Sequence, residues 1–112
     1  MGGRAGGYAE AVIAMILPIR LRRPAQAEYD DAVDWYESHW RGLGPRFVAA
    51  IRQVLHAVAA QPDRYPEVWP GVREAPVSGW PYCVYYQVHS DHVMVLAVFH
   101  TSRDPSVWQL RT

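Results

Sequence analysis

The chain has 112 residues, half of them hydrophobic, and its 11 arginines balance 11 acidic residues so that the formal net charge is zero. This composition fits one globular domain, excludes a disordered chain, and gives no strong electrostatic reason to bind nucleic acid. The single cysteine, Cys83, excludes an internal disulfide framework and a cysteine-based zinc site, and the absence of lysine excludes Schiff-base and P-loop lysine chemistry.

The first 14 residues are rich in Gly and Ala, and we predict a disordered leader or an over-extended start there, with Met15 as the alternative first residue. The apolar run Ala11–Leu17 directly follows Glu10 and ends at Pro18. It is too short for a membrane-spanning helix, which needs about 20 apolar residues. It meets only the lower length limit of a signal peptide, with an acidic residue directly before it and charged, strand-like sequence after it. We therefore expect a cytoplasmic protein with no membrane partner and one domain over residues 15–112.

Two amphipathic helices are predicted after a short strand at Ile16–Arg22. Pro24 suits the first turn of a helix, and apolar or aromatic residues then recur every three or four positions. These residues are Ala25, Tyr29, Ala32, Tyr36 and Trp40. The other side of this helix is expected to face solvent and carries five acidic residues: Glu28, Asp30, Asp31, Asp34 and Glu37. Glycines and a proline over residues 41–45 separate it from a second helix over residues 45–61, and the short connection predicts an antiparallel helical hairpin.

The rest of the chain is predicted to be mainly β. Three prolines between residues 61 and 71 indicate a loop with no regular element, and a strand follows at Val72–Val77. Two β-rich runs, Tyr82–His89 and His92–Phe99, flank two turn-forming residues and predict a hairpin. The tail from Asp104 to Leu110 is predicted to form one or two helical turns.

The hairpin register predicts two sheet faces of different character. With His89 opposite His92, one face is almost wholly apolar and is expected to receive the helical hairpin. Its members are Tyr82, Val84, Tyr86, Val88, Val93, Val95, Ala97 and Phe99. The other face, which includes Tyr85, mixes polar and apolar residues and is expected to stay open to a partner or substrate. His100 is expected opposite Pro81, at the end of the last strand.

Together these elements predict an α+β fold. A small antiparallel-rich sheet of about four strands is packed on one face by the N-terminal helical hairpin, and a short C-terminal helix follows.

Several short motifs accompany this predicted order of elements. They are AVDWY from Ala32, GLGPRF from Gly42, PDRYP from Pro62, Arg73, WPYCVYY from Trp80, VLAVFHTSRDP from Val95, and Trp108. The ordered set, from Ile16 to Arg111, resembles the RelE/ParE superfamily of toxins from bacterial type II toxin–antitoxin modules, and the ParE-like plasmid-stabilisation branch in particular. The resemblance implies a small toxin that is sequestered by a cognate antitoxin encoded beside it.

The resemblance leaves the cellular target open, because a fold does not fix a function. ParE-like members poison DNA gyrase, whereas RelE-like members cleave mRNA in the ribosomal A site. We expect a ParE-like toxin that binds its target, with gyrase as the leading candidate. The alternatives are a ribosome-dependent mRNA endonuclease and a degenerate toxin that retains only antitoxin binding.

Arg73, Tyr85, His100 and Arg103 are the candidate site residues, either for catalysis or for target binding. Metal-free RNA cleavage needs a base, an acid and a cation that stabilises the phosphate, and histidine and arginine supply these groups. Structural alternatives exist: Tyr85 packing across from Leu96, His100 bonding a backbone carbonyl, and Arg103 anchoring the tail. No cofactor or metal is expected.

Two departures from the family pattern favour binding over RNA cleavage. Cys83 stands where many members have arginine, and a neutral thiol cannot hold a phosphate. Residues 65–112 carry Arg73, Arg103 and Arg111 against Glu67, Glu74, Asp91 and Asp104. This half of the chain is therefore slightly acidic, whereas proteins that grip RNA present a cationic surface.

Overall fold

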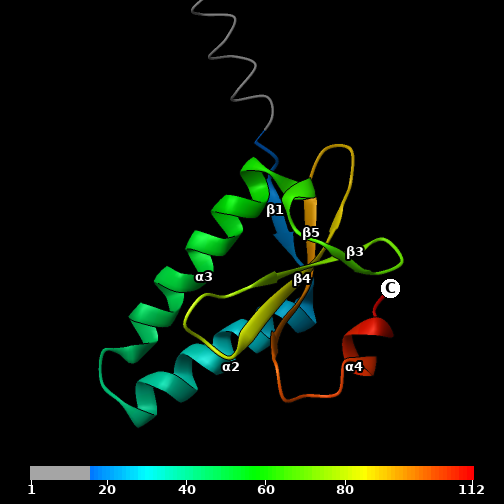
Figure 1. Cartoon of the computed structure of the whole chain (residues 1–112). Coiled ribbons are helices and arrows are strands. Elements are labelled where there is room, and N and C mark those ends of the chain that lie inside the picture. The colour runs from blue at the N-terminus through cyan, green and yellow to red at the C-terminus, as the bar shows by residue number, and fades with distance from the viewer. Residues whose placement is uncertain (1–15) are drawn as a thin grey trace, which may run out of the picture.

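The computed structural model describes residues 16–112, which form a mixed five-stranded sheet with two long helices on one face and a short helix on the other (Figure 1). The elements are β1 (Ile19–Leu21), α2 (Arg23–His39), α3 (Leu43–Ala60), the 3-10 turn η1 (Pro62–Arg64), β2 (Glu67–Trp69), β3 (Val72–Pro76), β4 (Tyr82–Val88), β5 (Val93–His100) and α4 (Ser106–Gln109). The expected leader over residues 1–14 and the alternative start at Met15 lie outside the described residues.

The strands lie in the order β1-β5-β4-β3-β2, with β1 parallel to β5 and every other pair antiparallel. The predicted α+β class is confirmed, with five strands in place of about four. The added strand, β2, and the turn η1 correct the prediction of a loop without regular structure. Gly71 adopts φ +75°, and its N–H donates to the Glu67 carboxylate at 2.6 Å, which closes a tight turn that returns the chain onto β3.

Helices α2 and α3 form the predicted antiparallel hairpin, and their connector is held by one carboxylate. Glu37 accepts a hydrogen bond from the Gly42 N–H at 2.6 Å, and Gly42 adopts φ +89°. Gly44 lets the helices approach closely, since a Cβ there would lie 3.1 Å from the Val33 carbonyl oxygen. The hairpin covers one face of the sheet with its apolar side.

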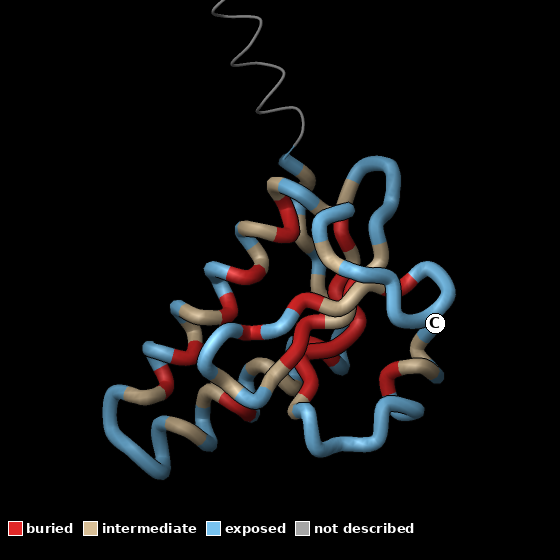
Figure 2. Tube along the Cα trace, in the orientation of Figure 1, coloured by how far each residue is buried: buried red, intermediate tan, exposed pale blue. Residues whose placement is uncertain are grey.

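The main core lies between this hairpin and the sheet. Its buried residues are Ala25, Ala32, Phe47, Ile51, Val54, Val58, Ala75, Val77, Val84, Tyr86, Val93, Val95 and Val98. Figure 2 shows buried positions along the inner side of α3 and through the central strands, while the far end of the helical hairpin is exposed. Tyr86 is fully buried, and its hydroxyl donates to the Pro62 carbonyl at 2.6 Å, which joins the core to η1.

Trp40 corrects the predicted helix stripe. It is 73% exposed because α2 ends at His39 and Trp40 takes an extended conformation at the C-cap, with φ −152°. The remaining stripe residues are buried or pack against the core.

The predicted register of the β4–β5 hairpin is confirmed next to the turn, where Val88 faces Val93. Farther along, the register shifts by one between Tyr85 and Tyr86, which face Ala97 and Val95. Leu96 is therefore an extra residue in β5. A bulge of this kind reverses which residues beyond it point to each face.

The bulge corrects the predicted faces of the sheet. Ala97 and Phe99 do not face the helical hairpin but lie in a second cluster of buried residues on the opposite face, whereas Val98 joins the main core. For the same reason His100 lies opposite Tyr82 and not opposite Pro81.

The second face is not open as expected, because the C-terminal segment covers it. Trp108 of α4 is 2% exposed and is buried together with Val72, Leu96, Ala97 and Phe99. Figure 1 shows α4 on the side of the sheet away from α3. The sheet is thus covered on both faces, by a large layer and by a small one.

Candidate functional site

Arg73 lies on the face that carries the main core, opposite Tyr86, and supports the segment before β2. Its guanidinium donates to the Tyr65 carbonyl at 2.6 Å and to the Asp63 carbonyl at 3.3 Å, and it lies 3.6 Å from the Asp63 carboxylate. Arginine forks that are used in this way fix a loop and leave fewer donors for a ligand.

Tyr85 points to the opposite face and packs against the tail. Its ring stacks on Trp108 with centroids 4.2 Å apart and planes 17° apart, and its hydroxyl donates to the Glu74 carboxylate at 2.7 Å. Burial, together with the hydrogen bond and negative charge of Glu74, raises the pKa of the Tyr85 hydroxyl well above its ordinary value. Arg73 and Tyr85 are therefore held on different sides of the sheet.

His100 lies at the end of β5 with its ring edge-on to Tyr82, the centroids being 5.1 Å apart. Its Nδ1 accepts a hydrogen bond from the Ser102 backbone N–H at 3.0 Å and lies 2.8 Å from the Ser102 hydroxyl oxygen. The expected bond to a backbone carbonyl is thus replaced by one from a backbone N–H. Because Nδ1 accepts, the neutral ring carries its proton on Nε2.

Arg103 follows three residues later and reaches back to α2. Its Nη1 donates to the Glu28 carboxylate at 2.7 Å, and its guanidinium lies 4.2 Å from the centre of the Phe99 ring. Of the four candidate residues, His100 and Arg103 are the two that line one hollow.

Two adjoining hollows lie between α2 and the ends of β4 and β5. The first, of about 240 Å³, is lined by Glu28, Asp31, Ala32, Trp35, Tyr82, Val98, His100 and Arg103. The second, of about 430 Å³, is lined by Trp35, Tyr36, Pro81, Tyr82 and His100. They share Trp35, Tyr82 and His100, and we call the two together the aromatic hollow.

Sequence reasoning missed the α2 side of this site. Glu28, Asp31 and Trp35 are spaced by three and four residues and therefore lie along one side of the helix. That spacing is visible in the sequence, but five acidic residues along one side of a helix indicate a solvated surface equally well.

Glu28 is the residue that organises the site. Its side chain is 13% exposed and accepts hydrogen bonds from the Val98 N–H at 3.2 Å, from Arg103, and from both Nη1 and Nη2 of Arg111 at 2.9 Å. Arg111 also donates to the Leu96 carbonyl at 2.9 Å. These bonds give partners to the Val98 N–H and the Leu96 carbonyl, which lie in β5 beyond the residues that pair with β1. They also connect the C-terminal segment to α2.

The comparisons with known proteins agree with this fold. A family model described as "ParE toxin of type II toxin-antitoxin system, parDE" matches residues 19–105, which is most of the chain. The chain belongs to the ParE toxin family. A solved chain of the chromosomal ParDE system from P. aeruginosa is similar in fold, with a TM-score of 0.57 and 20% sequence identity over 77% of this chain and 97% of that one. A comparison with curated proteins gave no significant match.

Cys83, at the position where arginine is expected in many family members, lies on β4 opposite Phe99. Cys83 is buried, and burial raises the pKa of its thiol, so the side chain is neutral and shielded from solvent. It contributes packing in place of a cation.

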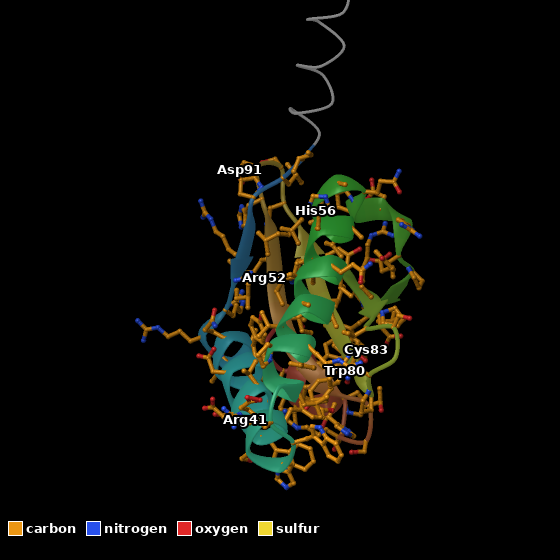
Figure 3. The ribbon with its side chains drawn as sticks, turned by 90° about the vertical axis from the view of Figure 1, so that its left-hand side faces the viewer. Arg41, Arg52, His56, Trp80, Cys83 and Asp91 are labelled. Carbon is orange, nitrogen blue, oxygen red and sulfur yellow. The ribbon has the colours of Figure 1, made fainter. Side chains whose placement is uncertain are left out.

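A wider, shallow groove of about 820 Å³ lies elsewhere, along the helical hairpin. Its lining includes Val33 of α2 and Val48, Arg52 and His56 of α3. Figure 3 shows Arg52 and His56 on α3, on the side of the molecule away from α4. These side chains do not form a catalytic grouping.

In the described part of the chain, none of the helices has the length and hydrophobicity needed to span a bilayer.

Proposed function

We propose that this ParE-family chain is a toxin that stops growth by binding a cellular target, with DNA gyrase as the leading candidate, and that a cognate antitoxin neutralises it. The observation that carries the proposal is the separation of the four polar candidates. Arg73 and Tyr85 lie on opposite faces of the sheet, and both are engaged in structural contacts. A centre for RNA cleavage requires its acid, base and cation around one phosphate.

The groups that do share a hollow are unsuited to a phosphate. His100 and Arg103 are accompanied there by the carboxylates of Glu28 and Asp31, and Glu28 already pairs with Arg103. Carboxylates beside a bound phosphate oppose its negative charge. This hollow therefore favours protein contacts over RNA chemistry.

The charge of the whole chain supports the same proposal. Its formal net charge is zero, whereas proteins that hold RNA on the ribosome depend on a cationic surface. A toxin that acts through a protein–protein contact has no such requirement.

The test is a supercoiling assay with purified gyrase and the purified chain. We expect inhibition that rises with toxin concentration and is lost when the antitoxin is added. His100→Ala should weaken the inhibition, because His100 lines both parts of the aromatic hollow. His89→Ala is the matched control, because His89 is an exposed histidine at the other end of the hairpin.

Two results would overturn the proposal. Growth arrest with unaffected gyrase and cleaved mRNA would identify a ribosome-dependent endonuclease. A chain that binds the antitoxin but arrests nothing would identify a degenerate toxin.

A further inference from the structure

Trp35 is an exposed aromatic residue on a surface that also carries charged and polar groups. It is 56% exposed, although its ring stacks on His39 with centroids 3.9 Å apart and meets the edge of Tyr36 at 5.1 Å. These contacts hold the ring in place at the wall of the aromatic hollow. Tyr82 also lines both parts of the hollow.

The hollow carries one carboxylate that has no direct partner among the described residues. Glu28 pairs with both Arg103 and Arg111, but within residues 16–112 Asp31 makes neither an ion pair nor a side-chain hydrogen bond. Asp31 is exposed and lies one helical turn before Trp35, so both side chains line the same hollow. A carboxylate without an ion-pair partner, beside aromatic rings, can receive a cation that contacts both.

We propose that the aromatic hollow receives an arginine side chain of the cognate antitoxin. This proposal rests on the proposed function, and the antitoxin is the partner that the family match implies. The guanidinium would lie against the Trp35 ring and pair with Asp31, while its aliphatic stem would run along Tyr36 and Pro81.

Arginine fits this site better than the alternatives. A planar guanidinium stacks on an aromatic face and forms paired hydrogen bonds with a carboxylate, whereas the lysine ammonium is a compact and strongly hydrated charge. An anionic ligand would meet Asp31 and Glu28. A neutral aromatic ligand would leave Asp31 without a partner.

The first test uses the full chain and N-acetyl-arginine amide as the probe, followed by NMR. We expect saturable shifts of the Trp35 indole resonance and of the His100 amide, with the Trp40 indole unmoved. The neutral isostere N-acetyl-citrulline amide should bind roughly five-fold or more weakly, because it lacks the charge that pairs with Asp31.

Matched variants show whether the probe binds in the aromatic hollow. Asp31→Asn and Trp35→Ala should each weaken binding roughly five-fold or more, as read from the His100 amide. Asp34→Asn and Trp40→Ala make the same chemical changes at exposed positions of the same segment that do not line the hollow, and they should have no effect. Equal binding of arginine and citrulline probes, or equal effects of Asp31→Asn and Asp34→Asn, would overturn the proposal.

The second test measures the affinity of the antitoxin for the same four variants. We expect Asp31→Asn and Trp35→Ala to weaken the complex by about ten-fold or more relative to their controls. If the wild-type chain binds the antitoxin and all four variants bind equally, this inference fails while the proposed function stands. If the wild-type chain binds no antitoxin, the proposed function fails, and the assignment of the hollow to the antitoxin fails with it.

Discussion

The two faces of the sheet are covered by layers of very different size. Helices α2 and α3, of 17 and 18 residues, cover one face, whereas α4, of four residues, covers the other. The first layer encloses the main core, while the second encloses a smaller cluster around Trp108 and is fastened by the contacts of Glu28 with Arg103 and Arg111. Because buried apolar area sets most of the stability, the hairpin layer should carry global stability and the tail layer should open locally.

The largest expected effect is in the hairpin layer. Phe47 is fully buried, and its ring lies 5.0–5.1 Å from those of Tyr36, Trp80 and Tyr82. Phe47→Ala should lower the free energy of unfolding by about 3–5 kcal/mol, as measured by denaturant titration. Leu110→Ala, at a site that is 88% exposed, should leave the free energy of unfolding within about 0.5 kcal/mol of wild type.

A smaller effect is expected in the tail layer. Trp108→Ala removes the ring that covers Leu96 and Phe99, and we expect a loss of about 2–3 kcal/mol, because this layer opens without unfolding the rest. Hydrogen exchange should rise in residues 101–112, which follow β5, before it rises in α3. Equal increases in both regions would show that the two layers unfold as one unit.

The contacts of Glu28 that hold the tail provide a further test of the difference between the two layers. Glu28→Gln removes the charge that Arg103 and Arg111 share, and it should cost about 1–3 kcal/mol, because Arg111 is only 15% exposed and is left without its carboxylate. Faster exchange of the Val98 amide and of residues 103–112 is the expected readout. Unchanged protection there, compared with an Asp34→Asn control, would contradict this role for Glu28.

The smallest effect at neutral pH concerns Tyr86. Tyr86→Phe removes the hydrogen bond to the Pro62 carbonyl and should cost about 1 kcal/mol. Burial raises the pKa of the Tyr86 hydroxyl to about 12, so the unfolded state loses this proton at lower pH than the folded state does. The ionisation of Tyr86 should therefore leave stability unchanged below pH ~10 and lower it as the pH rises from ~10 to about 12.

Denaturant titrations across this range test the assignment. Tyr86→Phe should reduce the loss of folding stability between pH ~10 and about 12. An identical decline in wild type and variant would assign the decline to other tyrosines.

The sequence predicted the larger layer well because its signals are long and local. Both helices show apolar residues at helical spacing, and the register beside the hairpin turn follows from alternation. The bulge at Leu96 has no such signal, because an extra residue in an apolar run leaves the run apolar while reversing its faces. Ala97 and Phe99 were therefore assigned to the wrong face.

The smaller layer and the site depend on contacts between distant parts of the chain. Glu28 meets Arg103 and Arg111 across 75 and 83 residues, so nothing local distinguishes it from the other acidic residues of α2. The four residues of α4 are too few to show a period, and β2 has only three residues. The candidate residues were named from their chemistry, and their separation between two faces emerged only from the packing.

The central claim is that this toxin acts by binding and leaves RNA intact. Sequencing of mRNA 5′ ends within minutes of induction, in cells without the antitoxin, tests it most directly. We predict growth arrest with an unchanged pattern of mRNA ends. New ends that are phased with codons in translated genes would contradict the account.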